Sequence, residues 1–297
     1  MSHNASRRGC GGEKRKILVV YAILCLLMNP DISVIIPTFN RRDRIAKALT
    51  SVLAQEDVCF EIIVADDGST DGTGEMIQKD FPSVSYFWQK NQGPSAARNR
   101  AIERAKGDWI AFLDSDDEWT PDKLKMQLYF FEKHPAFSIC QTEEIWIRNG
   151  VRVNPMNKHK KYGGWIFEKC LPLCIVSPSA VMIHKTLFSE VGLFDESLPA
   201  CEDYDLWLRI ACRYPIGLVE QNCVIRYGGH ADQRSHEFPA MDRFRIQSLV
   251  KLLASEKLEL AQAELAKKTL EEKSTIYIQG ALKRGKVQEA EEIRNLL

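Results

Sequence analysis

The sequence predicts an α/β fold with a mostly parallel sheet, flanking helices and a helical extension at the C-terminus. Three observations predict it. Short β-branched runs alternate with amphipathic, helix-length segments through about residue 135, which is typical of parallel βαβ units with right-handed crossovers. Several of the apolar runs end directly in acids, as buried strands do where they reach a ligand-binding edge. Strand signals then cease from about residue 239.

Length and composition restrict the class of protein. The 297 residues can form one large domain, or one domain with an appendage. Lys plus Arg and Asp plus Glu number 40 each, so the net charge is zero and no nucleic-acid partner is expected. The nine cysteines are scattered without a C-x-x-C pair. This usage favours free thiols in a reducing, cytoplasmic compartment.

The first 30 residues are predicted to be an N-terminal extension. Basic residues precede an apolar run at 17–28 that is too short to span a bilayer as a helix. Its length is typical of a signal-peptide core, but no small-residue cleavage pattern follows. Three interpretations stay open: a non-structural extension from an upstream start codon, a membrane-surface anchor, and a true signal. The anchor would place the protein at the inner face of the membrane.

Periodicity predicts the elements of the first half. Apolar residues such as Ile45, Leu49 and Val52 recur at helical spacing. Pro94 suits a first helical turn, and Thr120 is the expected cap of the helix after it in the chain. Strands are predicted at 32–37, 60–65, 83–88 and 108–113, and helices at 44–55, 74–79, 94–106 and 121–133.

The second half is less regular. Strands are predicted at 137–140, 144–147, 179–184 and 217–227, a helix at 203–213, and a mobile loop at 152–164. The tail is predicted to be helical with breaks near Ser274 and Gly285, forming a hairpin that packs on the core or mediates self-association into a homo-oligomer. We expect a domain at 31–238 and a helical extension at 239–297.

An acidic cluster ends one of the predicted strands. Residues 110–117 read Ile-Ala-Phe-Leu-Asp-Ser-Asp-Asp. Carboxylates at a strand end suit a hard divalent cation, which prefers oxygen ligands and leaves room for substrate phosphates. A turn with helix caps explains the same residues equally well. Because Thr38, Asp66, Asp67, Asp114 and Asp116 all follow parallel strands, we expect them at one edge of the sheet.

A later helix adds a matching motif, and the chain then resembles a known family. The resemblance is to family 2 of the nucleotide-sugar glycosyltransferases, which invert at the anomeric carbon and have the GT-A fold, a Rossmann-like, mostly parallel sheet with flanking helices. It covers roughly residues 31–230 and implies an enzyme that uses a nucleotide-sugar donor, most often a UDP-sugar, and a saccharide or lipid-linked acceptor. The matching stretches, in order, are residues 33–40, 64–73, 91–99, 110–117 and 202–209.

The resemblance implies roles for the donor side. Asp66 or Asp67 would accept a hydrogen bond from a base N–H, although either could be a turn acid before Gly68. Thr38 would meet the nucleotide or cap its strand. Arg98 would reach the diphosphate as an always-charged fork, or be a solvated helical arginine.

The resemblance also implies a metal and a base. Asp116 would bind Mn²⁺ or Mg²⁺ directly, with Asp114 nearer the ribose or a metal-bound water, and the ion would stabilise the leaving diphosphate. His230 would add a metal or phosphate contact, or be a surface histidine. Asp203 would take the proton of the acceptor hydroxyl; its alternative is a helix N-terminal acid, and Asp205 lies off the matched position.

Two other classes of function compete with a glycosyltransferase. A sugar-phosphate nucleotidyltransferase would carry a glycine-rich loop after the first strand, but residues 37–42 read Pro-Thr-Phe-Asn-Arg-Arg. A non-catalytic nucleotide-sugar-binding protein on the same fold would not need all the acids described above. Peripheral membrane association stays open.

Overall fold

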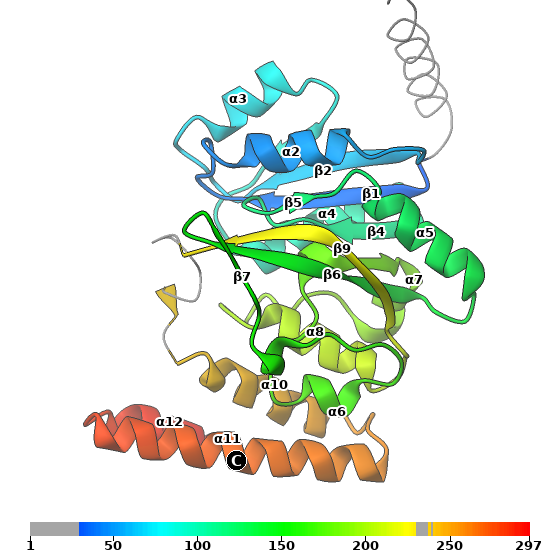
Figure 1. Cartoon of the computed structure of the whole chain (residues 1–297). Helices are drawn as coiled ribbons and strands as arrows, with labels where there is room; N and C mark the ends of the chain where they lie inside the picture. The colour runs from blue at the N-terminus through cyan, green and yellow to red at the C-terminus, as the bar shows by residue number, and fades with distance from the viewer. Residues whose placement is uncertain (1–29, 230–236, 239) are drawn as a thin grey trace, which may run out of the picture.

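The computed structural model of the chain describes residues 30–229, 237–238 and 240–297 (Figure 1). The apolar run at 17–28 and His230 therefore lie outside the described residues, as do the predictions made for them. In the described part, no helix combines the length and the apolar character needed to cross a membrane. Each cysteine in this part is a free thiol, as the scattered spacing predicts.

One nine-stranded sheet forms the centre of the molecule. Its strands are β1 (Ile32–Thr38), β2 (Phe60–Asp66), β3 (Ser85–Trp88), β4 (Trp109–Phe112), β5 (Glu118–Trp119), β6 (Ile139–Arg148), β7 (Val151–Val153), β8 (Val181–His184) and β9 (Gly217–Gly228). Their order is β3-β2-β1-β4-β8-β6-β9-β5, with β7 paired to β6. Only β5, β7 and β8 run against the common direction. The mostly parallel sheet predicted from the sequence is confirmed.

The strands β1 and β2 divide the apolar core between the two faces of the sheet. Every residue of β1 is buried. Ile35 and Ile63 belong to one apolar cluster, whereas the alternate residues Val34 and Val64 belong to another. Because successive side chains of a strand point to opposite faces, a continuous apolar run is what a strand covered on both sides requires.

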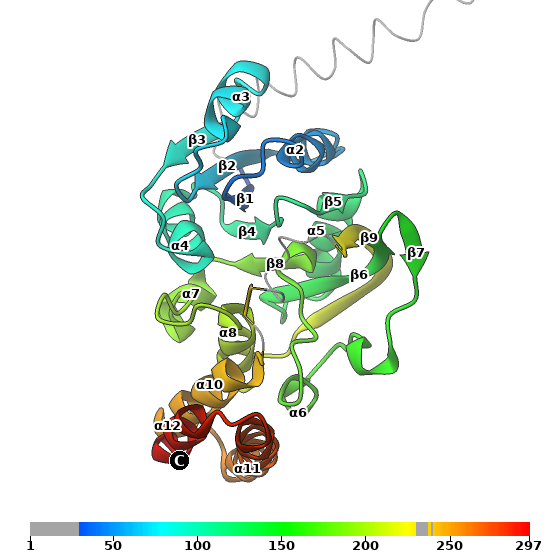
Figure 2. The ribbon, with the colours of Figure 1, turned by 90° about the vertical axis from the view of Figure 1, so that its left-hand side faces the viewer.

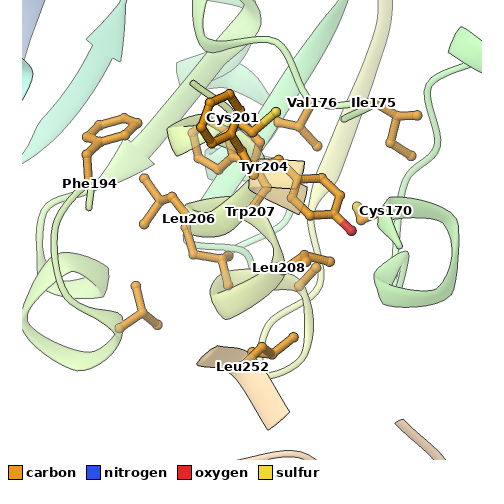
Figure 3. Packing of buried hydrophobic residues seen from close by; sticks show 14 of the residues in the cluster. Cys170, Ile175, Val176, Phe194, Cys201, Tyr204, Leu206, Trp207, Leu208 and Leu252 are labelled. Carbon is orange, nitrogen blue, oxygen red and sulfur yellow. The ribbon is translucent and has the colours of Figure 1, made fainter. Parts of the chain in front are cut away.

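Helices cover both faces. They are α2 (Ile45–Leu53), α3 (Thr73–Asp80), α4 (Pro94–Arg104), α5 (Lys123–Lys133), α6 (Phe167–Cys170), α7 (Thr186–Val191) and α8 (Glu202–Ala211). Figure 2 shows α2 and α4 on opposite sides of the sheet. The helix α8 lies on the α4 side, where Tyr204 and Trp207 are fully buried among apolar side chains (Figure 3).

The C-terminal helices pack on this α/β core. They are α10 (Asp242–Ala254), α11 (Leu260–Lys283) and α12 (Val287–Leu296). Phe244 and Leu252 of α10 belong to the same apolar cluster as Trp207 of α8. The break predicted near Gly285 is confirmed, but the one near Ser274 is wrong. Ser274 is buried within α11, where its small side chain lies in helical register with other buried residues.

Two further local predictions are wrong, and the loop prediction is right only in part. Residues 139–148 form one strand rather than two. The sequence suggests two strands because residues 141–144 are polar and interrupt the apolar pattern, at the point where the pairing with β9 shifts register. The predicted loop at 152–164 contains part of β7 and a 3-10 turn at Asn157–His159. Thr120 is not a helix cap: α5 begins at Lys123, and the Thr120 hydroxyl donates to Asp122.

Lys123, the first residue of α5, is fully buried. The Lys123 ammonium donates to Gln127 Oε1 at 2.6 Å and lies 3.9 Å from the centroid of the Trp119 ring. Burial lowers the pKa of Lys123 to about 7. Since the unfolded chain holds this proton up to the ordinary pKa of 10.5, folding must release it within this interval, and the free energy of unfolding rises with pH there.

The Lys123→Met variant tests this burial. We expect its free energy of unfolding, relative to wild type, to fall by about 1.4 kcal/mol for each unit of rising pH between those two values, because only the wild type has the lysine to titrate. Urea denaturation at several pH values measures the difference. Lys125→Met on the same helix is the control, since Lys125 is exposed. A pH-independent difference for Lys123→Met would contradict the prediction.

Candidate active site

The carboxyl ends of β1 and β2 form the first part of the candidate site. Pairing Thr38 with Asp66 brings these ends together, and the Asp67 N–H donates to the Thr38 carbonyl at 2.8 Å. The Thr38 hydroxyl is buried and has no hydrogen-bond partner in the described part of the chain. The hydrogen-bonding capacity of this hydroxyl is thus unused by the described residues.

The two acids after β2 hold different segments. Asp66 accepts hydrogen bonds from the Ser69 N–H and the Tyr86 hydroxyl, at 2.8 and 2.9 Å, and so shapes the turn after the strand. Asp67 accepts from Gln89 Nε2 at 2.7 Å. It also accepts from the Gln92 and Gly93 N–H groups, at 2.9 and 2.7 Å. Asp67 therefore connects β2 to the start of α4. Its Oδ2 accepts one hydrogen bond and can accept a second.

The acidic cluster after β4 contains one structural acid and two half-exposed ones. Asp117 is buried and accepts from the Ser179 hydroxyl at 2.7 Å and the Tyr227 N–H at 3.1 Å. Burial raises the pKa of Asp117, and the charges of Asp114 and Asp116 raise it further, against the opposing charge of Arg226. Both readings of the sequence thus have a counterpart here: Asp117 organises a turn, while Asp114 and Asp116 are partly accessible.

Arg98 joins this cluster to a distant helix. Its guanidinium donates to Asp114 Oδ1 and to Glu202 Oε1, each at 2.8 Å, and the residue is 5% exposed. These two carboxylates hold the pKa of Arg98 above its ordinary value although burial opposes it. The bridge fixes the carboxyl end of β4 against the N-terminus of α8. Contact of Arg98 with a diphosphate stays a prediction.

The N-terminus of α8 presents Asp203. Its Oδ1 accepts from the Tyr204 N–H at 2.7 Å, and its Oδ2 accepts from the Cys174 thiol at 3.3 Å. Burial and the charge of Glu202 raise the pKa of Asp203. Asp205, the alternative, is buried and paired with Arg209 at 2.7 Å. Asp205 is therefore engaged in holding the helix in place.

A pocket opens beside Asp203. Sequence reasoning did not predict its charged and aromatic lining, which includes Glu144, Trp146, His159 and Arg226. The Arg226 guanidinium lies 5.4 Å from the Trp146 ring centroid and 3.6 Å from Glu144 Oε1. Partial desolvation lowers the pKa of Arg226, but the carboxylates of Glu144, Asp117, Asp114 and Asp203 outweigh it and raise the pKa. The pocket and the acidic cluster thus share one electrostatic environment.

The acidic cluster fits a hard divalent cation. Asp114 and Asp116 offer half-exposed carboxylate oxygens, and their crowding with Asp117 leaves negative charge that a cation would offset. Among the residues with described positions, no three His, Cys, Asp or Glu side chains are grouped to hold a metal by themselves. Substrate phosphates and water commonly complete the ligand set of Mg²⁺.

Comparison with known proteins agrees with this geometry. Residues 33–192 match the model of glycosyl transferase family 2, and residues 163–259 match that of glycosyltransferase like family 2. The chain belongs to glycosyl transferase family 2.

Two relatives illustrate the range of similarity. An uncharacterized glycosyltransferase of Rickettsia conorii is 38% identical over 198 residues, which is 66% of this chain and 32% of the relative. The chain thus spans about a third of the length of that relative. The Escherichia coli enzyme WfaP, a UDP-Glc:alpha-D-GlcNAc-diphosphoundecaprenol beta-1,3-glucosyltransferase, is 36% identical over 186 residues, which is 60% of this chain and 69% of WfaP.

Solved structures share the fold. Residues 1–349 of S. aureus TarS, in complex with UDP-GlcNAc, superpose with a TM-score of 0.65 at 21% identity, covering 81% of this chain and 70% of that one. The mannosyltransferase PcManGT of Pyrobaculum calidifontis, in complex with GDP-Man and Mn²⁺, gives 0.59 at 17% identity, covering 92% and 84%. The predicted GT-A fold is confirmed.

The Arg98 bridge can be tested by removing its charge. We expect Arg98→Met to lower the free energy of unfolding by about 3–5 kcal/mol, because Asp114 and Glu202 would be left without their cation. Urea denaturation followed by circular dichroism measures the loss. Arg100→Met, at an exposed position of the same helix, should change stability by less than about 0.5 kcal/mol. Equal effects of the two variants would show that the bridge contributes nothing.

Proposed function

We propose that the chain is a metal-dependent, inverting glycosyltransferase that moves a sugar from a nucleotide diphosphate sugar, a UDP-sugar in the first instance, to an acceptor hydroxyl. The observation that carries this proposal is the Arg98 bridge, because it holds the acidic cluster of β4 next to the helix that presents Asp203. A donor site and a proton acceptor side by side are what sugar transfer by direct displacement requires.

The donor would lie along the carboxyl ends of β1, β2 and β4. Asp67 has lone-pair capacity for a base N–H, and the buried Thr38 hydroxyl has no partner among the described residues. Asp116 would hold the divalent ion directly, with Asp114 nearer the ribose or a metal-bound water. When bound, Mn²⁺ or Mg²⁺ supplies Lewis-acid stabilisation of the departing diphosphate.

The acceptor would enter the pocket beside Asp203. Its hydroxyl oxygen attacks the anomeric carbon while its proton passes to the Asp203 carboxylate. The bond between the anomeric carbon and the diphosphate oxygen breaks, and the electron pair leaves with the nucleoside diphosphate. A single displacement of this kind inverts the anomeric centre. The pKa of Asp203, raised by burial and by Glu202, makes the carboxylate a stronger base than a solvated aspartate.

We place this activity in polysaccharide or lipid-linked glycan synthesis at the cytoplasmic face of a membrane. WfaP acts on a diphosphoundecaprenol-linked acceptor, as its name states, and aligns with 60% of this chain. The free thiols of the described part suit a reducing compartment. UDP-Glc with a GlcNAc-diphosphate lipid is therefore the first donor and acceptor pair to assay.

Asp203→Asn tests the assignment of the base. We expect transfer from UDP-Glc to fall by about 10²- to 10⁴-fold, because an amide cannot take the acceptor proton. The dissociation constant of UDP, measured by calorimetry, should stay within about twofold of wild type, since the proposed nucleotide contacts lie at strand ends and Asp203 lies on a helix. The control is Asp108→Asn, an exposed acid paired with Lys185 at the opposite end of β4. Wild-type transfer by Asp203→Asn would show that another group is the base.

Asp116→Ala tests the metal site. In wild type, Mn²⁺ should tighten UDP binding because the ion links the diphosphate to the acidic cluster. We expect the factor by which Mn²⁺ tightens UDP binding to be at least about tenfold smaller in the variant, while the affinity for UDP without metal is unchanged. Calorimetric titrations with and without Mn²⁺ separate the two quantities, and Asp108→Ala is the control. The same Mn²⁺ enhancement in Asp116→Ala and wild type would remove Asp116 from the metal site.

A further inference from the structure

A thiol lies against the candidate base. Cys174 belongs to the segment between α6 and β8, is half-buried, and lines the same pocket as Asp203. Its sulfur is 3.3 Å from Asp203 Oδ2 and 3.2 Å from the carbonyl oxygen of Val176. A thiol has a single proton, so it can donate to only one of these acceptors at a time.

The two oxygens of Asp203 therefore have different kinds of donor. Oδ1 accepts from the Tyr204 backbone N–H at 2.7 Å, and this donor is fixed by the helix. Oδ2 accepts from a thiol that can rotate about its Cβ–Sγ bond. The segment carrying the thiol is itself held in place, because the Tyr204 hydroxyl donates to the Leu171 carbonyl at 2.6 Å. The rotation of the thiol is thus the adjustable part of this arrangement.

We propose that Cys174 is a positioning residue for the base, whose S–H donates to Oδ2 of ionised Asp203 and turns to the Val176 carbonyl when Oδ2 takes the acceptor proton. This inference rests on the proposed function. No bond to sulfur forms or breaks: the proton passes from the acceptor hydroxyl to Oδ2, and the S–H only changes its acceptor. A fixed donor at Oδ2 would instead oppose the arriving proton.

The chemistry of Cys174 suits a donor. Burial and the neighbouring charge of Asp203 raise the pKa of Cys174 well above its ordinary value, so the group stays a thiol at neutral pH. The hydrogen bond from the thiol favours the ionised form of Asp203. It partly offsets the rise in the pKa of Asp203 that burial and Glu202 cause. The carboxylate is thereby kept available for proton uptake.

Other charged and titratable groups lie near Asp203 and Cys174, and Glu144 of β6 and His159 of the 3-10 turn line the same pocket. Glu202 lies on the same helix as Asp203, Arg98 on α4 and Arg226 on β9. Arg245 on α10 and the thiols of Cys170 and Cys201 act on Cys174. The Cys170 side chain provides a matched control, since it is a buried thiol of the same cluster that does not line the pocket.

The experiment compares Cys174→Ala, Cys174→Ser and Cys170→Ala in the full chain. With UDP-Glc and the GlcNAc-diphosphate lipid, we expect Cys174→Ala to shift the acidic limb of the kcat/KM profile to higher pH, with the rate there falling about three- to tenfold. Cys174→Ser keeps a rotatable donor and should restore the wild-type limb, while Cys170→Ala should leave it unchanged. Mere loss of packing would not be rescued in this way.

A second measurement is independent of activity. ¹³C NMR of carboxyl-labelled aspartate, with Asp203→Asn to identify the signal, gives the titration midpoint of Asp203 directly. We expect the midpoint to move upward in Cys174→Ala and not in Cys170→Ala. An unchanged midpoint together with an unchanged acidic limb would overturn the inference, whereas an inactive wild type with a shifted midpoint would overturn only the proposed function.

Discussion

The ion pairs of Arg98 are the constraint on which the rest of the site depends. A buried guanidinium shared between Asp114 and Glu202 is costly to desolvate, and it is stable only while both carboxylates stay in place. Conversely, each carboxylate would be an uncompensated charge without the arginine. This mutual dependence fixes α4, the end of β4 and the start of α8 as one unit, and it does so with a planar group whose two donors have a set geometry.

This unit gives the site an uneven charge distribution. After β4, the charges of Asp114 and Asp116 lie close enough to Asp117 to oppose its ionisation. At the start of α8, Asp203 lies next to Glu202, and the Glu202 carboxylate is paired with Arg98. The carboxylates of the acidic cluster and of Asp203 both raise the pKa of Arg226. A divalent cation, as proposed for this site, would offset the negative charge of the acidic cluster and of a departing diphosphate.

The sequence predicts the first half of the fold well because periodicity is a local property. In β1 and β2 and in α2, the spacing of apolar residues reports directly which side chains are buried. The two-residue β5 and the four-residue α6 are too short to show a period. The antiparallel direction of β8 depends on how the chain returns to the sheet, and no local pattern encodes that return.

The same distinction applies to the site. The strand-end acids could be predicted because parallel strands bring their carboxyl ends to one edge. The partners of Arg98 lie 16 and 104 residues away in sequence, so its bridging geometry could not be read from the helix that carries it. Cys174 and Arg226 come from an irregular segment and from the last strand, and their contact with the site arises only from tertiary packing.

The packing of α10 has a consequence for the whole chain. Phe244 and Leu252 share an apolar cluster with Trp207, which lies on α8, the helix that carries Asp203. Figure 3 shows Leu252 near Trp207. Among the described residues, the C-terminal helices thus pack on the helix that carries Asp203, the proposed base, and have no comparable packing against β1 or β2. Local opening of the C-terminal helices would therefore loosen α8 first, and the Arg98 ion pairs would transmit this loosening to the end of β4.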